Sequence, residues 1–274
     1  MKSNLSSITA LLYLALFLLT SVSSATDDFP GRAKYPGVPV LSKYELKKKF
    51  KEVVIVDTRS KLEFDTLRIN GAKNISVASK TFADQIKTLR SKTDKTIVFY
   101  CNGKTCMKSY RAVKKAKKAR VENTIAYDAG MFEWAKAYPE LASLFGQSPI
   151  QPSKIISKQD FKARSLEPND FIEKVHKMGS QSLVLDIRDK YQRGATGFFP
   201  GKERWASLDD RKKLDKYISQ AKRENRPLFI YDEVGKQVRW LQYALEKNNI
   251  KDYYFMDSGA KGYCTQMMKD FGVR

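Results

Sequence analysis

Residues 96–107 read TIVFYCNGKTCM, an apolar run that ends at Cys101, turns through Gly103 and enters a segment with helical spacing. The run from Ile97 to Tyr100 is β-branched and aromatic, which is typical of a strand buried on both faces of a sheet. A cysteine between such a strand and a helix lies among backbone N–H groups and near the positive end of the helix dipole. Both features favour a thiolate. The stretch therefore predicts that Cys101 is a reactive thiol.

Similar alternation extends outward from this stretch. Apolar runs recur at residues 53–56 and 124–127, and residues 82–89 carry apolar side chains with helical spacing. Strand patterns that alternate with helical patterns predict an α/β fold with a mainly parallel β-sheet flanked by α-helices.

The chain also repeats itself at long range. Residues 52–59 and 182–188 are both apolar runs that end in Asp-x-Arg, 97–101 matches 228–232, and 126–130 matches 255–259. The order and spacing of these pairs predict two globular units of one α/β type. Turn-forming residues at 145–153 mark the linker. We expect the two domains at residues 35–147 and 154–274.

The N-terminus has the pattern of a secretory signal peptide. Lys2 precedes an apolar core at residues 10–19, and small residues at 21–25 offer a cleavage site before Thr26. The core is short for a transmembrane helix, which needs ~20 apolar residues. We expect residues 1–25 to be removed and the mature chain to be exported, periplasmic or secreted, without a stable membrane anchor. An uncleaved anchor is the alternative.

Charge and cysteine content narrow the chemistry further. The 274 residues carry 51 Lys and Arg against 30 Asp and Glu, so the net charge is 51 − 30 = +21. This balance suits anionic substrates or acidic partners, or reflects lysine used only for solubility. Export and the lack of a recognisable nucleic-acid module argue against nucleic acid. Three cysteines and one histidine form neither a disulfide framework nor a metal site, and no cofactor is expected.

Taken together, these motifs resemble a tandem rhodanese, the thiosulfate sulfurtransferase family. The resemblance covers about residues 41–139 well and about residues 161–271 with weaker motifs. Its family pattern appears here in five pieces, which are Asp57-Thr58-Arg59, Glu63-Phe64, Gly71-Ala72-Lys73-Asn74-Ile75, Tyr100-Cys101, and Asp128 to Trp134. Two departures from the family pattern bear on which substrate the protein prefers. Arg68 and Asn70 replace the usual His and Pro, and Cys106 and Met107 replace the usual Arg-Ser at the end of the loop.

The resemblance implies a sulfurtransferase in which Cys101 takes a sulfane sulfur from a small anionic donor such as thiosulfate and passes it to cyanide or a thiol, through a persulfide. The second copy has Asp232 at the cysteine position, and a carboxylate cannot carry a persulfide, so we expect that copy to be catalytically silent. Backbone amides from Gly103 to Met107 would stabilise negative charge at Cys101. The expected substrate-binding residues of the loop are Asn102, Gly103, Lys104, Thr105, Cys106, Met107 and Lys108.

Other side chains have less specific interpretations. Cys106 is either a resolving thiol that attacks the Cys101 persulfide or a packing residue at the helix start. Asp57 and Arg59 are interpreted as a structural ion pair at a strand end.

Alternative functions stay open. A non-catalytic scaffold or persulfide carrier would bind an acceptor protein, whereas a thiol–disulfide oxidoreductase would use Cys101 and Cys106 without a sulfur donor. A phosphate-binding loop is excluded because Val98 stands where its first glycine is required. A cysteine phosphatase would need an arginine at Met107.

Overall fold

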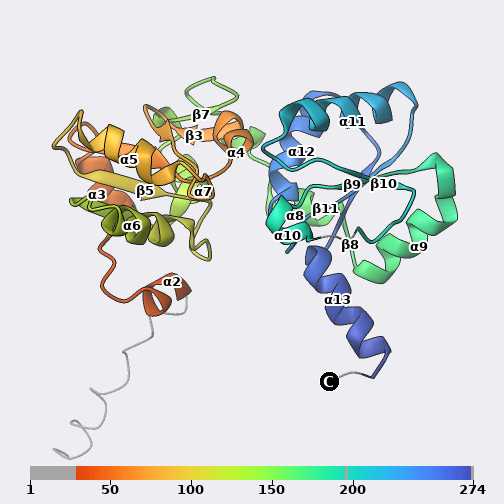
Figure 1. The fold of residues 1–274 in the computed structure, drawn as a ribbon. Helices are drawn as coiled ribbons and strands as arrows, with labels where there is room; N and C mark the ends of the chain where they lie inside the picture. The colour runs from red at the N-terminus through yellow and green to blue at the C-terminus, as the bar shows by residue number, and fades with distance from the viewer. Residues whose placement is uncertain (1–28, 195–196, 273–274) are drawn as a thin grey trace, which may run out of the picture.

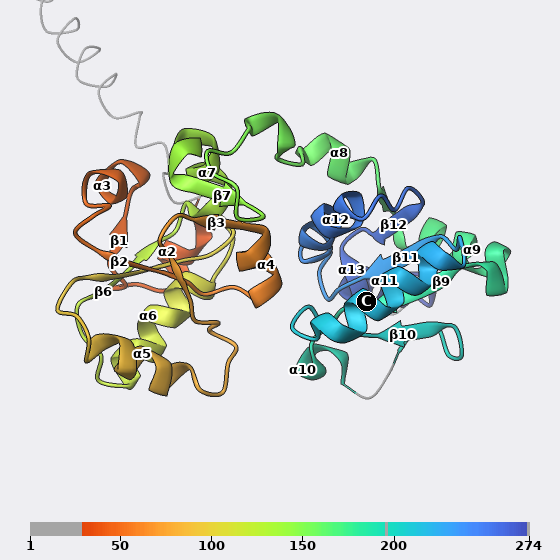
Figure 2. The same ribbon diagram turned by 90° about the horizontal axis from the view of Figure 1, so that it is seen from above.

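The computed structural model describes residues 29–194 and 197–272, so the predicted signal peptide at residues 1–25 lies outside the described residues. Each half of the chain forms a five-stranded sheet whose strand pairs are all parallel. Figure 1 shows the two α/β halves side by side, and Figure 2 shows the connection that passes from α7 to α8 between them. The predicted fold class is confirmed.

The first half, residues 29–151, has the strand order β1-β6-β5-β2-β4. Its sheet strands are β1 (Val40–Leu41), β2 (Val54–Asp57), β4 (Lys73–Asn74), β5 (Ile97–Tyr100) and β6 (Thr124–Tyr127). A separate antiparallel pair joins β3 (Leu67–Ile69) to β7 (Ala142–Leu144). The helices are α2 (Pro30–Lys34), α3 (Lys43–Lys48), α4 (Lys61–Thr66), α5 (Phe82–Arg90), α6 (Lys108–Lys118) and α7 (Gly130–Ala137), followed by the 3₁₀ turn η1 (Pro139–Leu141).

The second half, residues 152–272, has the order β10-β9-β11-β12-β8. Its strands are β8 (Ser165–Leu166), β9 (Leu183–Asp186), β10 (Glu203–Trp205), β11 (Leu228–Tyr231) and β12 (Tyr253–Met256). The helices are α8 (Lys158–Lys162), α9 (Pro168–Met178), α10 (Lys190–Arg193), α11 (Arg211–Arg223), α12 (Val238–Lys247) and α13 (Gly259–Asp270), with 3₁₀ turns η2 (Pro152–Lys154) and η3 (Gly179–Gln181).

The two sheets have one topology. Strands β8, β9, β10, β11 and β12 correspond to β1, β2, β4, β5 and β6. With this correspondence, the strand order of the second sheet is that of the first sheet written in reverse. The registers correspond as well, because Asp57 pairs with Tyr100 and Asp186 pairs with Tyr231. Each Asp-x-Arg segment therefore lies beside the strand that leads into the loop at Cys101 or Asp232.

Burial on both faces explains the continuous apolar strands. In β5, Ile97 and Phe99 belong to one core cluster, and Val98 and Tyr100 belong to the cluster on the opposite face. Helices α5 and α6 cover the first face and α7 covers the second. Because neither face meets water, the strand needs no polar alternation.

The second half packs against the first through α12. Trp240 and Tyr243 of α12 belong to the same buried cluster as Trp134 and Tyr100 of the first half. The rings of Phe132 and Trp240 stack with a centroid separation of 4.9 Å. The halves thus share a hydrophobic interface at the end of the first sheet where Cys101 lies.

In the part of the chain that is described, no helix combines the length and apolar character needed to cross a membrane.

Candidate functional site

The loop that begins at Cys101 leaves the central strand of the first sheet. Strands β2 and β6 lie on either side of β5, and all three end at the same edge. Parallel strands bring their carboxyl ends together, and open α/β sheets bind ligands outside that edge. The predicted position of Cys101 at a strand end, before a loop and helix, is therefore what the structure shows.

The Cys101 thiol is fully buried. It donates a hydrogen bond to the carbonyl oxygen of Cys106, with a distance of 3.3 Å from Sγ to O, and its sulfur lies 3.8 Å from Ser109 Oγ. Burial raises the pKa of the Cys101 thiol well above its ordinary value, and interaction with Cys106 raises it further. Hydrogen bonds from the backbone N–H and the hydroxyl of Ser109 act in the opposite direction and lower the Cys101 pKa.

The pKa of Cys106 shifts in the opposite direction. A hydrogen bond from the Cys101 thiol lowers the Cys106 pKa most. Burial opposes this effect, and the Lys108 charge with the N–H groups of Lys108 and Asn102 adds to it, giving a pKa of about 6. Cys106 is half-buried and lines a cavity, which Cys101 does not. Cys106 is therefore the cysteine of the pair that faces the cavity, whereas Cys101 is buried.

The amides of the loop are also arranged differently from the prediction. The Cys106 N–H, expected to face the Cys101 sulfur, donates to the Gly103 carbonyl oxygen at 2.8 Å. The N–H groups of Asn102 and Lys108 lower the pKa of Cys106, and the N–H group of Ser109 lowers the pKa of Cys101. Both cysteines therefore lie close to the first turn of α6.

A network of buried charged and polar side chains holds the loop in position. Arg59 is fully buried and binds both carboxylate oxygens of Asp57, at 2.9 and 2.6 Å. Its other amino group donates to Asn102 Oδ1 at 3.1 Å, and Asn102 donates in turn to Glu63 Oε1 at 2.8 Å. Arg59 thus fixes the first residue of the loop and does not line the cavity.

Glu63 is the functional residue that the sequence reasoning did not single out. Burial alone would raise its pKa, but the charges of Lys108 and Arg59 and hydrogen bonds from Asn102 and Ser60 lower the pKa to about 2. Its Oε2 accepts from Lys108 Nζ at 3.4 Å and from the Ser60 N–H at 2.9 Å. The pattern Ser60-x-x-Glu63 is a capping box, and that signal was readable in the sequence.

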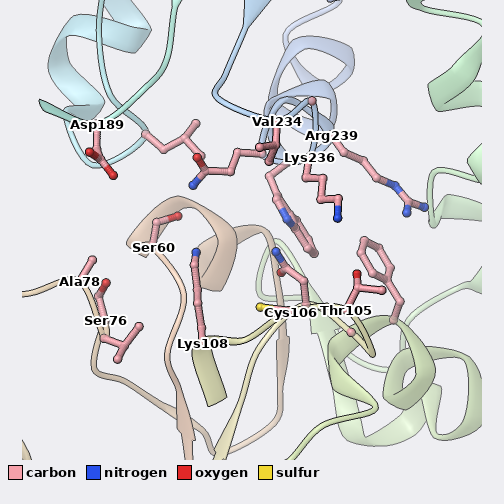
Figure 3. A pocket seen from close by; sticks show the side chains of 18 of the residues that line it. Ser60, Ser76, Ala78, Thr105, Cys106, Lys108, Asp189, Val234, Lys236 and Arg239 are labelled. Carbon is pink, nitrogen blue, oxygen red and sulfur yellow. The ribbon is translucent and has the colours of Figure 1, made fainter. Parts of the chain in front are cut away.

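A cavity of about 910 Å³ lies above the loop, between the two halves of the chain. Six of the seven predicted substrate-binding residues line it, namely Asn102, Gly103, Lys104, Thr105, Cys106 and Lys108, whereas Met107, the residue before α6, does not. Figure 3 shows Cys106, Thr105 and Lys108 on one wall, and Val234, Lys236 and Arg239 on the other.

The cavity is predominantly basic. Its basic lining residues are Lys104, Lys108, Arg111, Lys115, Lys158, Lys236 and Arg239, and its acidic ones are Glu133, Asp189 and Asp209. An excess of positive charge beside a thiolate suits a small anionic substrate. Within residues 29–194 and 197–272, no group of three His, Cys, Asp or Glu side chains is placed to hold a metal ion.

Close backbone contact keeps the first loop in place. Gly130, with φ +77°, lies so near the loop that a Cβ there would meet the Gly103 nitrogen at 2.3 Å. Only glycine satisfies both the positive φ and the close approach. Gly130 follows the apolar run at residues 124–127, and its contact with the loop explains why a glycine stands there.

Comparisons with known proteins agree with this description. Residues 42–137 match the family model described as the rhodanese-like domain, so the chain contains a rhodanese-like domain in its first half. No curated protein matches the chain.

Three of the solved structures that are similar to this chain differ in the function that their names describe. Thiosulfate sulfurtransferase from Pseudomonas aeruginosa is 16% identical with a TM-score of 0.36, over 84% of this chain and 44% of that one. The rhodanese-like domain of an Anabaena protein is 19% identical with a TM-score of 0.34, over 40% of this chain and 82% of that one. The As-Sb reductase from Leishmania major is 17% identical with a TM-score of 0.34, over 39% and 86%.

Proposed function

We propose that this protein is a sulfurtransferase that moves a sulfane sulfur from a thiosulfate-like anion to cyanide or a thiol, using the Cys101–Cys106 pair. The observation that carries the proposal is the Cys106 sulfur, which has a pKa of about 6 and lies on the wall of a basic cavity, with the Cys101 thiol behind it. A rhodanese-like domain at residues 42–137 supports the same chemistry.

The first step forms one sulfur–sulfur bond and breaks another. The Cys106 thiolate attacks the outer sulfur of thiosulfate, and sulfite leaves with the electron pair of the broken S–S bond, so that Cys106 becomes a persulfide. Lys108 and the N–H groups of Asn102 and Lys108 stabilise the negative charge at this position. Cyanide then removes the outer sulfur as thiocyanate and restores the thiolate.

Cys101 offers a second exit for the sulfur. Its thiol, once deprotonated, attacks the inner sulfur of the Cys106 persulfide, which gives a Cys101–Cys106 disulfide and releases hydrosulfide. An external thiol must then reduce the disulfide. This assigns the carrier to Cys106 and the resolving thiol to Cys101, whereas the sequence alone suggested the reverse, because Cys106 is the thiol that reaches the cavity.

Location and partners belong to the same proposal. Export after removal of residues 1–25 would place this chemistry outside the cytoplasm. The basic cavity would take the small anionic donor, and the acceptor would be cyanide, a thiol or an acceptor protein with an accessible cysteine. The signal-like N-terminus and the net charge of +21 support these points.

The test is the mass of the intact mature protein before thiosulfate, after thiosulfate and after later addition of cyanide, with peptide mapping of the cysteines. We expect a gain of one sulfur on Cys106 that cyanide removes. Cys106→Ser should prevent the gain, and Cys264→Ser is the matched control because Cys264 lies on α13, outside the cavity lining.

Three other results would each change the proposal in a different way. Sulfur on Cys101 would return the two roles to those suggested by the sequence and would leave sulfur transfer intact. Absence of sulfur on both cysteines would overturn the proposal. Repeated reduction of a disulfide substrate without any sulfur donor would instead identify a thiol–disulfide oxidoreductase, which the two neighbouring free thiols also permit.

A further inference from the structure

The second half of the chain has an anion-binding loop that is closed by its own carboxylate. Asp232 is fully buried, and its two oxygens accept hydrogen bonds from the N–H groups of Val234 at 2.8 Å, Val238 at 3.1 Å, Gly235 and Gln237. Successive N–H groups that converge on one anion form a nest. Because Asp232 fills that nest, these four N–H groups are not available to an external anion.

The same loop is pinned in position by its neighbour. A Cβ on Gly235, which has φ +69°, would lie 2.7 Å from the backbone nitrogen of Ser258. A Cβ on Gly259 would lie 2.4 Å from the backbone carbonyl oxygen of Asp232. Backbone therefore packs on backbone on both sides of the contact. A loop held this way can place a side chain in a fixed position without help from substrate.

Lys236 is the residue that this loop presents to the cavity. It lines the cavity together with Cys106, and Figure 3 shows its ammonium pointing from the second half toward the loop that bears Thr105 and Cys106. Among the described residues, no carboxylate lies within the 4.0 Å ion-pair distance of its Nζ. The positive charge of Lys236 is thus available to a ligand.

The cations under the Cys106 loop are already balanced. The half-buried Lys108 pairs with the buried Glu63, and Arg59 pairs with Asp57, both fully buried. These four groups together add no net charge to attract a dianion. Additional positive charge must therefore come from other parts of the cavity wall.

Arg239 of α12 also lines the cavity, but its contacts are structural. Its guanidinium lies 4.2 Å from the centroid of the Phe132 ring and donates to the carbonyl oxygen of Ile156. It therefore joins the two halves. Lys236, which has no such contacts, is left for the substrate.

We propose that the second half serves as the anion-recognition half of the first site, with Lys236 as a specificity-determining residue that draws a dianionic sulfur donor toward Cys106. The inference rests on the proposed function and deepens it. The carboxylate of Asp232 keeps the loop closed and rigid, and the side chain of Lys236 contacts the substrate that the loop itself no longer binds.

The test compares Lys236→Ala, Lys236→Glu and Lys236→Arg with wild type in the mature full-length protein. We expect the KM for thiosulfate to rise about 3- to 10-fold in Lys236→Ala and further in Lys236→Glu, with kcat little changed, because a lost cation weakens the encounter with a dianion. Lys236→Arg should restore the KM. The difference from wild type should shrink as salt is added.

Two controls separate this inference from other effects. Lys212→Ala removes the same charge from the exposed face of α11, outside the cavity lining, and should leave the KM unchanged. The cyanide step, followed in a single turnover from protein already loaded with sulfur, should proceed at the wild-type rate in every Lys236 variant.

The outcomes remain distinguishable from failure of the proposed function. If Lys236→Ala and Lys212→Ala have the same thiosulfate KM, or if Lys236→Ala lowers only kcat, the role of Lys236 is overturned while sulfur transfer stands. If wild type gains no sulfur even at saturating thiosulfate, the proposed function itself fails.

Discussion

The guanidinium carbon of Arg59 lies 4.7 Å from the centroid of the Trp240 ring, so the buried ion pair at the end of the first sheet directly contacts a helix of the second half. The same guanidinium holds Asn102, the residue after Cys101. A single side chain thus links the cysteine loop, the Asp57 carboxylate and the interface between the halves. The second half is part of the structural support of the site, although its own loop has no cysteine.

Replacing Trp240 with alanine should loosen that interface. Trp240 is buried, stacks on Phe132 and covers Arg59. Loss of such a side chain typically costs about 3–5 kcal/mol, so we expect a clear fall in the thermal unfolding midpoint and reduced sulfur loading. Tyr44→Ala, at a residue 70% exposed, is the control and should change little. Equal midpoints for the two variants would contradict the packing role of Trp240.

The pH dependence of sulfur loading should follow Cys106. Its pKa of about 6 lies below the ordinary thiol value of 9.0, so the thiolate fraction, and the single-turnover rate with thiosulfate, should rise with pH through about 6 and then level off. Cys101→Ala removes the hydrogen bond that lowers this pKa, and the profile should move to higher pH. Cys264→Ala should leave it in place. A wild-type profile that still rises near pH 9 would rule out Cys106 as the attacking thiol.

Replacing Glu63 with glutamine should destabilise the protein at neutral pH. The change leaves Lys108 and Arg59 without a buried negative partner, and breaking such a pair costs about 3–5 kcal/mol. The matched control is Glu140→Gln, which breaks a solvent-exposed pair with Lys47 and should change stability little. Denaturation monitored by circular dichroism measures both, and equal losses would contradict the network.

Glu63 should also contribute to acid sensitivity. Its folded-state pKa of about 2 is below the ordinary 4.5, so the stability it provides is present above pH 4.5 and is lost as pH falls toward 2. Glu63→Gln should therefore show a shallower loss of stability than wild type across that window. Parallel pH–stability curves for the two proteins would show that folding does not lower the Glu63 pKa.

Replacing Asp232 with asparagine should disturb the second loop. An amide group cannot accept all the N–H donors that converge on the carboxylate, and each unsatisfied buried donor costs about 1–3 kcal/mol. We expect a lower unfolding midpoint and, because Lys236 loses its fixed position, a higher KM for thiosulfate. Asp270→Asn, at the exposed end of α13, is the control. An unchanged KM in a destabilised Asp232→Asn protein would show that loop order does not position Lys236.

The fold class and the position of Cys101 at the end of a central strand could be predicted from the sequence alone. Continuous apolar runs can only be strands buried on both faces, and those at residues 53–56, 97–100 and 124–127 coincide with or overlap β2, β5 and β6. The strand–cysteine–glycine–helix order then put Cys101 at the ligand-binding edge of a parallel sheet. The long repeat likewise anticipated two sheets, because strand patterns are local and do not depend on whether Cys101 or Asp232 follows the strand.

Three features could be read only from the three-dimensional arrangement: which thiol lines the cavity, the partners of Glu63, and the residues that the second half adds to the site. The loop turns so that Cys106 reaches the cavity and Cys101 is buried beneath it, and no local pattern encodes that choice. The charge of Glu63 depends on Lys108, which is distant in sequence, and Trp240 and Lys236 reach the site from the opposite half of the chain. Burial and pairing between remote segments set the pKa values and cavity walls, whereas the sequence pattern reports only neighbours along the chain.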